Sequence, residues 1–165
     1  MSNTQKINDF FDNLTLEEEN LLAARLAPAI SRYQKSTPFY YGDEARVHVS
    51  KKVKLVNTFF NLISGNVYIK SGTFFGNNVS VLTGTHDISL KDGLRKKAPT
   101  KGNDIHIGYG VWIASNATIL GPCEIGDYAV IAAGSIVLPG KYEQGCLYAG
   151  VPAKFKKRIE FKEID

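Results

Sequence analysis

The chain has few of the residues that carry most redox, metal and disulfide chemistry: among 165 residues there are two cysteines, one methionine, one tryptophan and three histidines. Two cysteines, Cys123 and Cys146, cannot form the disulfide framework of a small secreted domain. No apolar run approaches the length that crosses a bilayer, and the polar, acidic N-terminal residues lack a signal-peptide pattern. We therefore expect a cytoplasmic protein without a membrane span.

Neither sign of charge dominates. Lys and Arg number 20 and Asp and Glu 16, giving a net charge of +4. This excess could attract an anionic ligand but is well short of a nucleic-acid-binding composition, so no nucleic-acid partner is expected. With 44% hydrophobic residues the chain can build one elongated core, and we predict a single domain over residues 1–165.

The chain is rich in a period of six residues. From Ile107 to Tyr142 it divides into the hexapeptides IGYGVW, IASNAT, ILGPCE, IGDYAV, IAAGSI and VLPGKY, each opening with Ile or Val. Three hexapeptides make one coil of eighteen residues, which would place Ile107 against Ile125 and Cys123 toward the interior. The pattern predicts an all-β solenoid of triangular cross-section.

The flanking segments differ in character. Residues 1–45 show helical spacing, with a capping box at Thr15–Glu18 and a further piece beginning near Pro28, and are predicted to form a short helical cap on the solenoid. The solenoid is predicted over residues 46–142, with a frame slip near Asn61 and a return to register at Ile63. Residues 143–165 form a tail, whose basic amphipathic end is predicted to be a helix.

An insertion interrupts the repeats. After His86 the segment 87–104 (DISLKDGLRKKAPTKGND) breaks the period before it restarts at Ile107. A solenoid tolerates insertions at its corners, and a long charged insertion is a natural place for a functional site.

The repeats and the tail resemble one family. IGYGVWIASNATILGPCEIGDYAVIAAGSIV followed by AGVPAK is similar to the hexapeptide-repeat acyltransferases, in the branch of galactoside, maltose and capsule-sugar O-acetyltransferases. The resemblance implies a left-handed parallel β-helix, a homotrimer, and acetyl-CoA bound in a groove between two parallel prisms. It implies no metal.

The resemblance also implies site residues. A histidine at the start of the inserted loop is the catalytic base in the family, and here it matches His86. An alcohol is a weak nucleophile at neutral pH, and a neutral imidazole is a suitable base for removing its proton. The matching cofactor-binding positions are Trp112, Ser115, Ala133, Lys154 and Lys157, and the candidates for acceptor binding are Asp87 and Asn61.

Several functions remain open at this stage. The leading hypothesis is acetyl transfer to a hydroxyl of a sugar, sugar nucleotide or polysaccharide precursor. The same machinery could N-acetylate an amino sugar nucleotide or acetylate an antibiotic. A carbonic-anhydrase-type zinc site would need His48, His86 and His106 to converge, and their spacing includes no close pair. A non-catalytic scaffold is the last alternative.

Overall fold

The computed structural model describes residues 3–163, and three sheets dominate it. Sheet A contains β1 (Phe39–Tyr41), β3 (Phe59–Asn61), β6 (Ser80–Leu82), β9 (Thr118–Leu120) and β12 (Ile136–Val137). Sheet B contains β2 (Val47–Val49), β4 (Val67–Ile69), β7 (Ile105–Ile107), β10 (Cys123–Ile125) and β13 (Gly140–Tyr142). Sheet C contains β5 (Phe74–Phe75), β8 (Trp112–Ile113), β11 (Val130–Ile131), β14 (Cys146–Ala149) and β15 (Lys154–Arg158).

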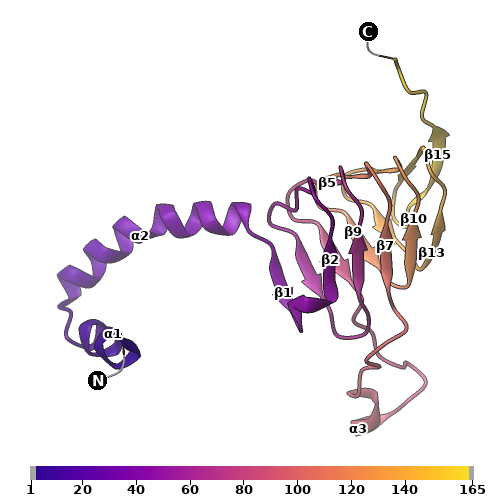
Figure 1. Cartoon of the computed structure of the whole chain (residues 1–165). Helices are drawn as coiled ribbons and strands as arrows, with labels where there is room; N and C mark the ends of the chain where they lie inside the picture. The colour runs from indigo at the N-terminus through magenta and orange to yellow at the C-terminus, as the bar shows by residue number, and fades with distance from the viewer. Residues whose placement is uncertain (1–2, 164–165) are drawn as a thin grey trace. The chain divides into compact units, whose positions relative to one another are not determined.

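The chain visits the three sheets in rotation, which confirms the predicted parallel β-solenoid (Figure 1). Ile107 lies opposite Ile125, and Ile113 opposite Ile131, so the eighteen-residue period sets the register. All strand pairs are parallel except β14 with β15. Each coil therefore satisfies the backbone hydrogen bonds of the next, as expected for a stacked repeat.

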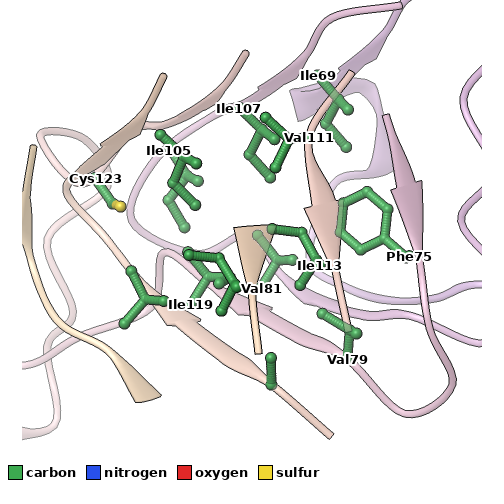
Figure 2. Packing of buried hydrophobic residues seen from close by; sticks show 14 of the residues in the cluster. Ile69, Phe75, Val79, Val81, Ile105, Ile107, Val111, Ile113, Ile119 and Cys123 are labelled. Carbon is green, nitrogen blue, oxygen red and sulfur yellow. The ribbon is translucent and has the colours of Figure 1, made fainter. Parts of the chain in front are cut away.

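The opening residue of each regular hexapeptide points into the prism. Figure 2 shows the opening residues Ile107, Ile113 and Ile119 gathered in this interior together with Ile105 and Cys123, and each of the five is at most 3% exposed. Burying an aliphatic side chain of this size stabilises the fold by about 1.5–3 kcal/mol. The hexapeptide repeat thus supplies its own core.

The first coils are less regular than predicted. Phe60, not Ile63, lies opposite Val81 and fills the interior position, and Leu62 is buried beside it. The prediction was therefore wrong at Ile63, although the later positions of the predicted frame, Ile69, Phe75 and Val81, are buried in the interior. Because residues 62–66 separate β3 from β4, whereas only residues 121–122 separate β9 from β10, the next buried strand position falls to Val67.

Contacts divide the chain into two compact units, Met1–Lys35 and Ser36–Asp165. The first contains α1 (Asn3–Asp12) and most of α2 (Leu16–Ser36). The capping box is present: Thr15 N donates to Glu18 Oε2 at 2.9 Å, and Glu18 N donates to Thr15 Oγ1 at 3.3 Å. These bonds from Thr15 lower the pKa of Glu18. The helix continues through Pro28, so no third piece begins there. The capping role of this unit stays a prediction.

The predicted boundaries of the solenoid were too narrow. Strand β1 is already part of sheet A, before the expected start at residue 46, and β14 extends sheet C beyond residue 142. A one-turn 3-10 helix, η1 (Glu44–Arg46), connects β1 to β2. Within residues 3–163, no helix is long and apolar enough to cross a membrane.

The predicted C-terminal basic helix was wrong. Residues Lys154–Arg158 form β15, which pairs antiparallel with β14. After the turn at 150–153 the chain meets the uncovered edge of sheet C, where the last coil leaves backbone groups unpaired. Pairing with that edge satisfies more hydrogen bonds than a short solvated helix could, and the ring of Phe155 packs 6.2 Å from that of Tyr148.

Candidate functional site

The inserted loop leaves the solenoid between sheets A and B. It follows β6, contains the short helix α3 (Asp92–Arg95) and returns to β7. Figure 1 shows α3 standing away from the stacked strands. His86 lies exposed at the point of departure, just beyond the last residues that bond to the coils. The structure therefore places His86 at the corner between sheets A and B, where the loop begins.

Asn61 is a candidate from a neighbouring strand whose side chain contacts the segment before His86. It ends β3, opposite Leu82 of β6. Its side chain packs against Gly84: a Cβ built on Gly84 would lie 2.4 Å from Asn61 Oδ1. The same oxygen accepts a hydrogen bond from Ile63 N at 3.2 Å. The predicted acceptor residue Asn61 and the His86 segment thus share one corner.

Asp87 follows His86 directly, and its carboxylate accepts hydrogen bonds from within the loop. Its Oδ1 accepts hydrogen bonds from Ser89 N at 2.9 Å and Ser89 Oγ at 2.6 Å. These bonds from Ser89 lower the pKa of Asp87. The carboxylate is therefore ionised near neutral pH and stabilises the first turn of the loop.

Two of the predicted cofactor residues stack at a different corner. Ser115 and Ala133 occupy equivalent positions in successive coils, between sheet C and sheet A, where Gly134 N donates to Ser115 O at 3.0 Å. The turns there need a left-handed residue, which Asn116 (φ 60°) and Gly134 (φ 67°) supply. Small side chains at this corner leave the backbone accessible to a ligand.

The other cofactor candidates lie on the outer face of sheet C. Trp112 is 45% exposed and stacks on Phe74, with ring centroids 5.9 Å apart and planes inclined by 17°. Lys157 is opposite Leu147, and Lys154 opposite Ala149, at the edge of the same sheet. Both lysines are exposed. Sheet C therefore carries an aromatic platform at one position and positive charge at its last strand.

The candidates form two groups on one protomer. Ser115 and Ala133 precede the strands of sheet A, whereas His86 follows one of them. The width of sheet A separates the two groups.

Arg46 is a structural contributor that the sequence did not indicate. Its Nη1 donates to Leu62 O at 3.0 Å, Ile63 O at 3.1 Å and Thr100 O at 3.1 Å. It thus ties the wide turn after β3 to the returning part of the loop. No motif surrounds Arg46, so only the three-dimensional contact shows this role.

The remaining histidines lie elsewhere. His48 and His106 stack on the two faces of Tyr68, each with ring centroids 4.7 Å from it, on the outer face of sheet B. A surface hollow of about 500 Å³ adjoins this stack, lined in part by Tyr68, His106 and Glu124. In the part of the chain from residue 3 to 163, no group of three or more His, Cys, Asp or Glu side chains could hold a metal ion.

Comparison with known proteins shows which transferases the repeats resemble. Residues 104–139 match the model of the bacterial transferase hexapeptide, with six repeats. Over these residues the chain is similar to the hexapeptide-repeat transferases. The matched residues coincide with the most regular coils, from the end of the inserted loop to the end of sheet A.

Among curated proteins, the chain is 29% identical over 103 residues to a galactoside O-acetyltransferase of Lactococcus lactis, covering 61% of this chain and 48% of that protein. It is 44% identical over 71 residues to a probable macrolide acetyltransferase of Lysinibacillus sphaericus, covering 42% of this chain and 38% of that protein. The chain thus spans about half or less of the length of these two relatives.

Solved structures agree with the fold. A galactoside acetyltransferase in complex with coenzyme A is 29% identical, with a TM-score of 0.59, covering 74% of this chain and 60% of that one. A maltose O-acetyltransferase from Clostridium difficile 630 is 22% identical, with a TM-score of 0.53, covering 95% of this chain and 84% of that one. The second likeness concerns the fold alone.

Proposed function

We propose that this protein is an acetyl-CoA-dependent O-acetyltransferase that acts on a hydroxyl of a sugar or polysaccharide precursor. The observation that carries the proposal is the exposed His86 imidazole, two residues after the Gly84 that packs against Asn61, at the corner where the loop interrupts a hexapeptide-repeat solenoid. The galactoside acetyltransferase solved with coenzyme A is the relative that supports the choice of donor. The expected cytoplasmic location fits an acetyl-CoA donor and stays a prediction.

In the proposed reaction His86 acts as general base. Its neutral imidazole removes the proton of the acceptor hydroxyl while the oxygen attacks the thioester carbonyl of acetyl-CoA. The tetrahedral intermediate collapses, the carbon–sulfur bond breaks, and the coenzyme A thiolate takes the proton back from the imidazolium. A positioned base of this kind contributes roughly 10²–10⁴ in rate.

We assign acetyl-CoA to the sheet C side of the solenoid. Ser115 and Ala133 offer a corner without bulky side chains for the pantetheine arm, and Trp112 adds an exposed ring nearby. Lys154 and Lys157 are the candidates for the adenosine phosphates, because exposed ammonium groups attract a polyanion. Asn61 and Asp87, at the other corner, are assigned to the acceptor.

The separation of these two groups is our reason to propose a homotrimer. In a cyclic assembly the A–B corner of one copy would meet the C–A corner of the next, so that His86 faces the cofactor held by its neighbour. The outer face of sheet A would then turn toward the symmetry axis. That face exposes apolar rings, with Phe39 opposite Phe59 and 45% and 38% exposed, respectively.

Acetylation of a macrolide antibiotic is a second candidate. It is favoured by the 44% identity over 71 residues to the probable macrolide acetyltransferase. The chemistry and the role of His86 would be the same, and only the acceptor would differ. N-acetylation would depend less on the base, because a free amine is already nucleophilic.

Thiol release from acetyl-CoA, measured over a panel of sugars, nucleotide sugars and macrolides, tests the function. With the active acceptor, His86→Ala should lower kcat by about 100-fold or more while acetyl-CoA binding persists. His48→Ala is the matched control, because it removes an exposed imidazole on sheet B and should leave kcat within about twofold. A fully active His86→Ala enzyme on a hydroxyl acceptor would contradict the mechanism.

A further inference from the structure

Two residues with buried hydroxyl groups, Ser64 and Thr83, lie at the corner where the segment carrying His86 leaves the coils. Ser64 is 0% exposed and Thr83 is 1% exposed, although most of the neighbouring core is apolar. Buried hydroxyl groups persist only when they are hydrogen-bonded, and among the described residues no buried side-chain polar atom lacks a partner. Their bonds all converge on the corner from which the loop departs.

Thr83 joins the incoming strand to the wide turn after β3. Its Oγ1 donates to Asn61 O at 2.9 Å and accepts from Ser64 N at 3.3 Å. The backbone of Thr83 repeats the connection, since Thr83 N also donates to Asn61 O at 2.9 Å. Thr83, three residues before His86, is therefore fixed by both its side chain and its backbone.

Ser64 extends this connection to the residue adjacent to His86. Its Oγ accepts a hydrogen bond from Thr85 N at 3.3 Å. Thr85 is the last residue before His86, and the next bonds along the chain are those that Ser89 makes with Asp87, inside the loop itself. The bond from Thr85 to Ser64 is thus the closest link between the His86 backbone and the rigid coils.

The returning end of the loop is bound to the same two residues. Asn103 Nδ2 donates to Thr83 O at 3.1 Å, and Asn103 N donates to Ser64 O at 3.1 Å. A Cβ on Gly65 would lie 2.6 Å from the Asn103 carbonyl carbon, so the backbones approach closely here. Both ends of the loop are therefore held by one cluster, formed by the buried Ser64 and Thr83 and the half-buried Asn103.

We propose that the hydroxyls of Ser64 and Thr83 are positioning groups for His86, acting through the Thr85 backbone. The inference rests on the proposed function. His86 is exposed and has no hydrogen bond of its own in the described contacts, so the direction of its ring depends on the backbone that carries it. A displacement of about 1 Å in a catalytic group can cost roughly 100-fold in rate.

The chain offers a matched control in Thr73. This threonine is also 0% exposed, and its Oγ1 donates to Gly108 O at 2.7 Å and accepts from Val111 N at 3.1 Å. It makes the same kinds of bond as Thr83, but at the corner between sheets B and C. Thr73→Val and Thr83→Val therefore remove equivalent hydroxyls and differ in their distance from His86.

The kinetic test compares these variants in the full-length protein. Thr83→Val should lower kcat about tenfold or more with the KM for acetyl-CoA unchanged, whereas Thr83→Ser, which keeps the hydroxyl, should restore kcat to within about threefold. Thr73→Val should lose similar thermal stability and keep kcat within about twofold. Equal loss of kcat in both valine variants, or no loss in either, would overturn the proposal.

A second readout does not depend on activity. The chain has three histidines, so the ring signals in an NMR spectrum can be assigned by replacing His48 and His106. Thr83→Val and Ser64→Ala should shift or broaden the signals of His86 and leave those of the other two unchanged. An unchanged His86 signal overturns the positioning role. A wild-type protein that transfers no acetyl group to any acceptor, but shows the selective shift, refutes the proposed function alone.

Discussion

The amide side chain of Asn61 lies against the backbone of Gly84, so closely that a Cβ on Gly84 would come within 2.4 Å of Asn61 Oδ1. This contact couples a candidate acceptor residue to the segment that carries His86. The glycine is required here by space, because any side chain would have to displace the amide. The contact leads to the first prediction.

Gly84→Ala should impair transfer more than it impairs folding. The added methyl group must displace the Asn61 side chain and break its 3.2 Å bond from Ile63 N. We expect about a tenfold loss of kcat/KM for the acceptor, measured by thiol release. Gly93→Ala is the control, since nothing lies within 4 Å of a Cβ at that position. Similar kinetics for the two variants would argue against the coupling.

Lys157→Gln should weaken the binding of acetyl-CoA. If the exposed ammonium group contacts a phosphate, its removal should raise the KM for acetyl-CoA by roughly two- to fivefold and leave kcat unchanged. The effect should shrink as salt is added, because exposed charges are screened. Titrations at low and high ionic strength check this, with the exposed Lys51→Gln as control. An effect that is independent of salt would speak against a phosphate contact.

Ile119→Ala should destabilise the solenoid strongly. Ile119 is 0% exposed and lies between Val81 and Val137 in adjacent coils. Removing its side chain leaves a cavity, for which we expect a loss of about 2–5 kcal/mol in the free energy of unfolding. Urea unfolding at fixed protein concentration measures the loss. Ile88→Ala, at a loop residue that is 87% exposed, should change the free energy by no more than about 0.5 kcal/mol.

Cys123 should make stability fall at high pH. Burial, with a contribution from the Glu124 carboxylate, raises the pKa of its thiol to about 12. The thiol of a cysteine in the unfolded chain has a pKa of about 8.5. The folded state therefore keeps a proton that the unfolded state releases, so this contribution to stability is complete below about pH 8.5 and is lost as the pH rises toward about 12.

Two measurements check this behaviour. Both cysteines are buried, so the native protein should react slowly with a thiol reagent at pH 8, and the denatured protein should react at two sites. Cys123→Val should show a smaller decrease in stability between pH 9 and pH 11 than the wild type. Rapid modification of native Cys123 would contradict the burial-based shift.

The sequence contained enough to predict the regular coils and the corner at which the loop leaves. The spacing of Ile107, Ile125 and their equivalents determines the register, because only an eighteen-residue coil buries all of them. Where the six-residue period breaks down, near Asn61, the predicted interior residue was wrong. Phe60, not Ile63, occupies the interior position, and the turn that follows it is held by hydrogen bonds from the distant Arg46, which no local pattern indicates.

The tail shows why a local pattern is insufficient. Its amphipathic spacing suits a helix, but the free edge of β14 is a property of the folded solenoid, and pairing with it decides the outcome. The candidate site likewise has one part that the sequence pattern indicates and another that only the folded structure shows. The position of His86 followed from the break in the repeats, whereas the support from Ser64 and Asn103 depends on chain segments that meet only after folding.

The fixed register also limits how such a protein can change length. In the regular coils each strand faces its equivalent eighteen residues later. Duplicating one whole coil would add a rung of roughly 4.8 Å and leave every later strand on its own sheet. Duplicating a single hexapeptide would rotate all that follows by one third of a turn, moving Lys157 to a different side from Trp112. Evolution can therefore extend this molecule only in steps of three hexapeptides if both corners are to keep their alignment.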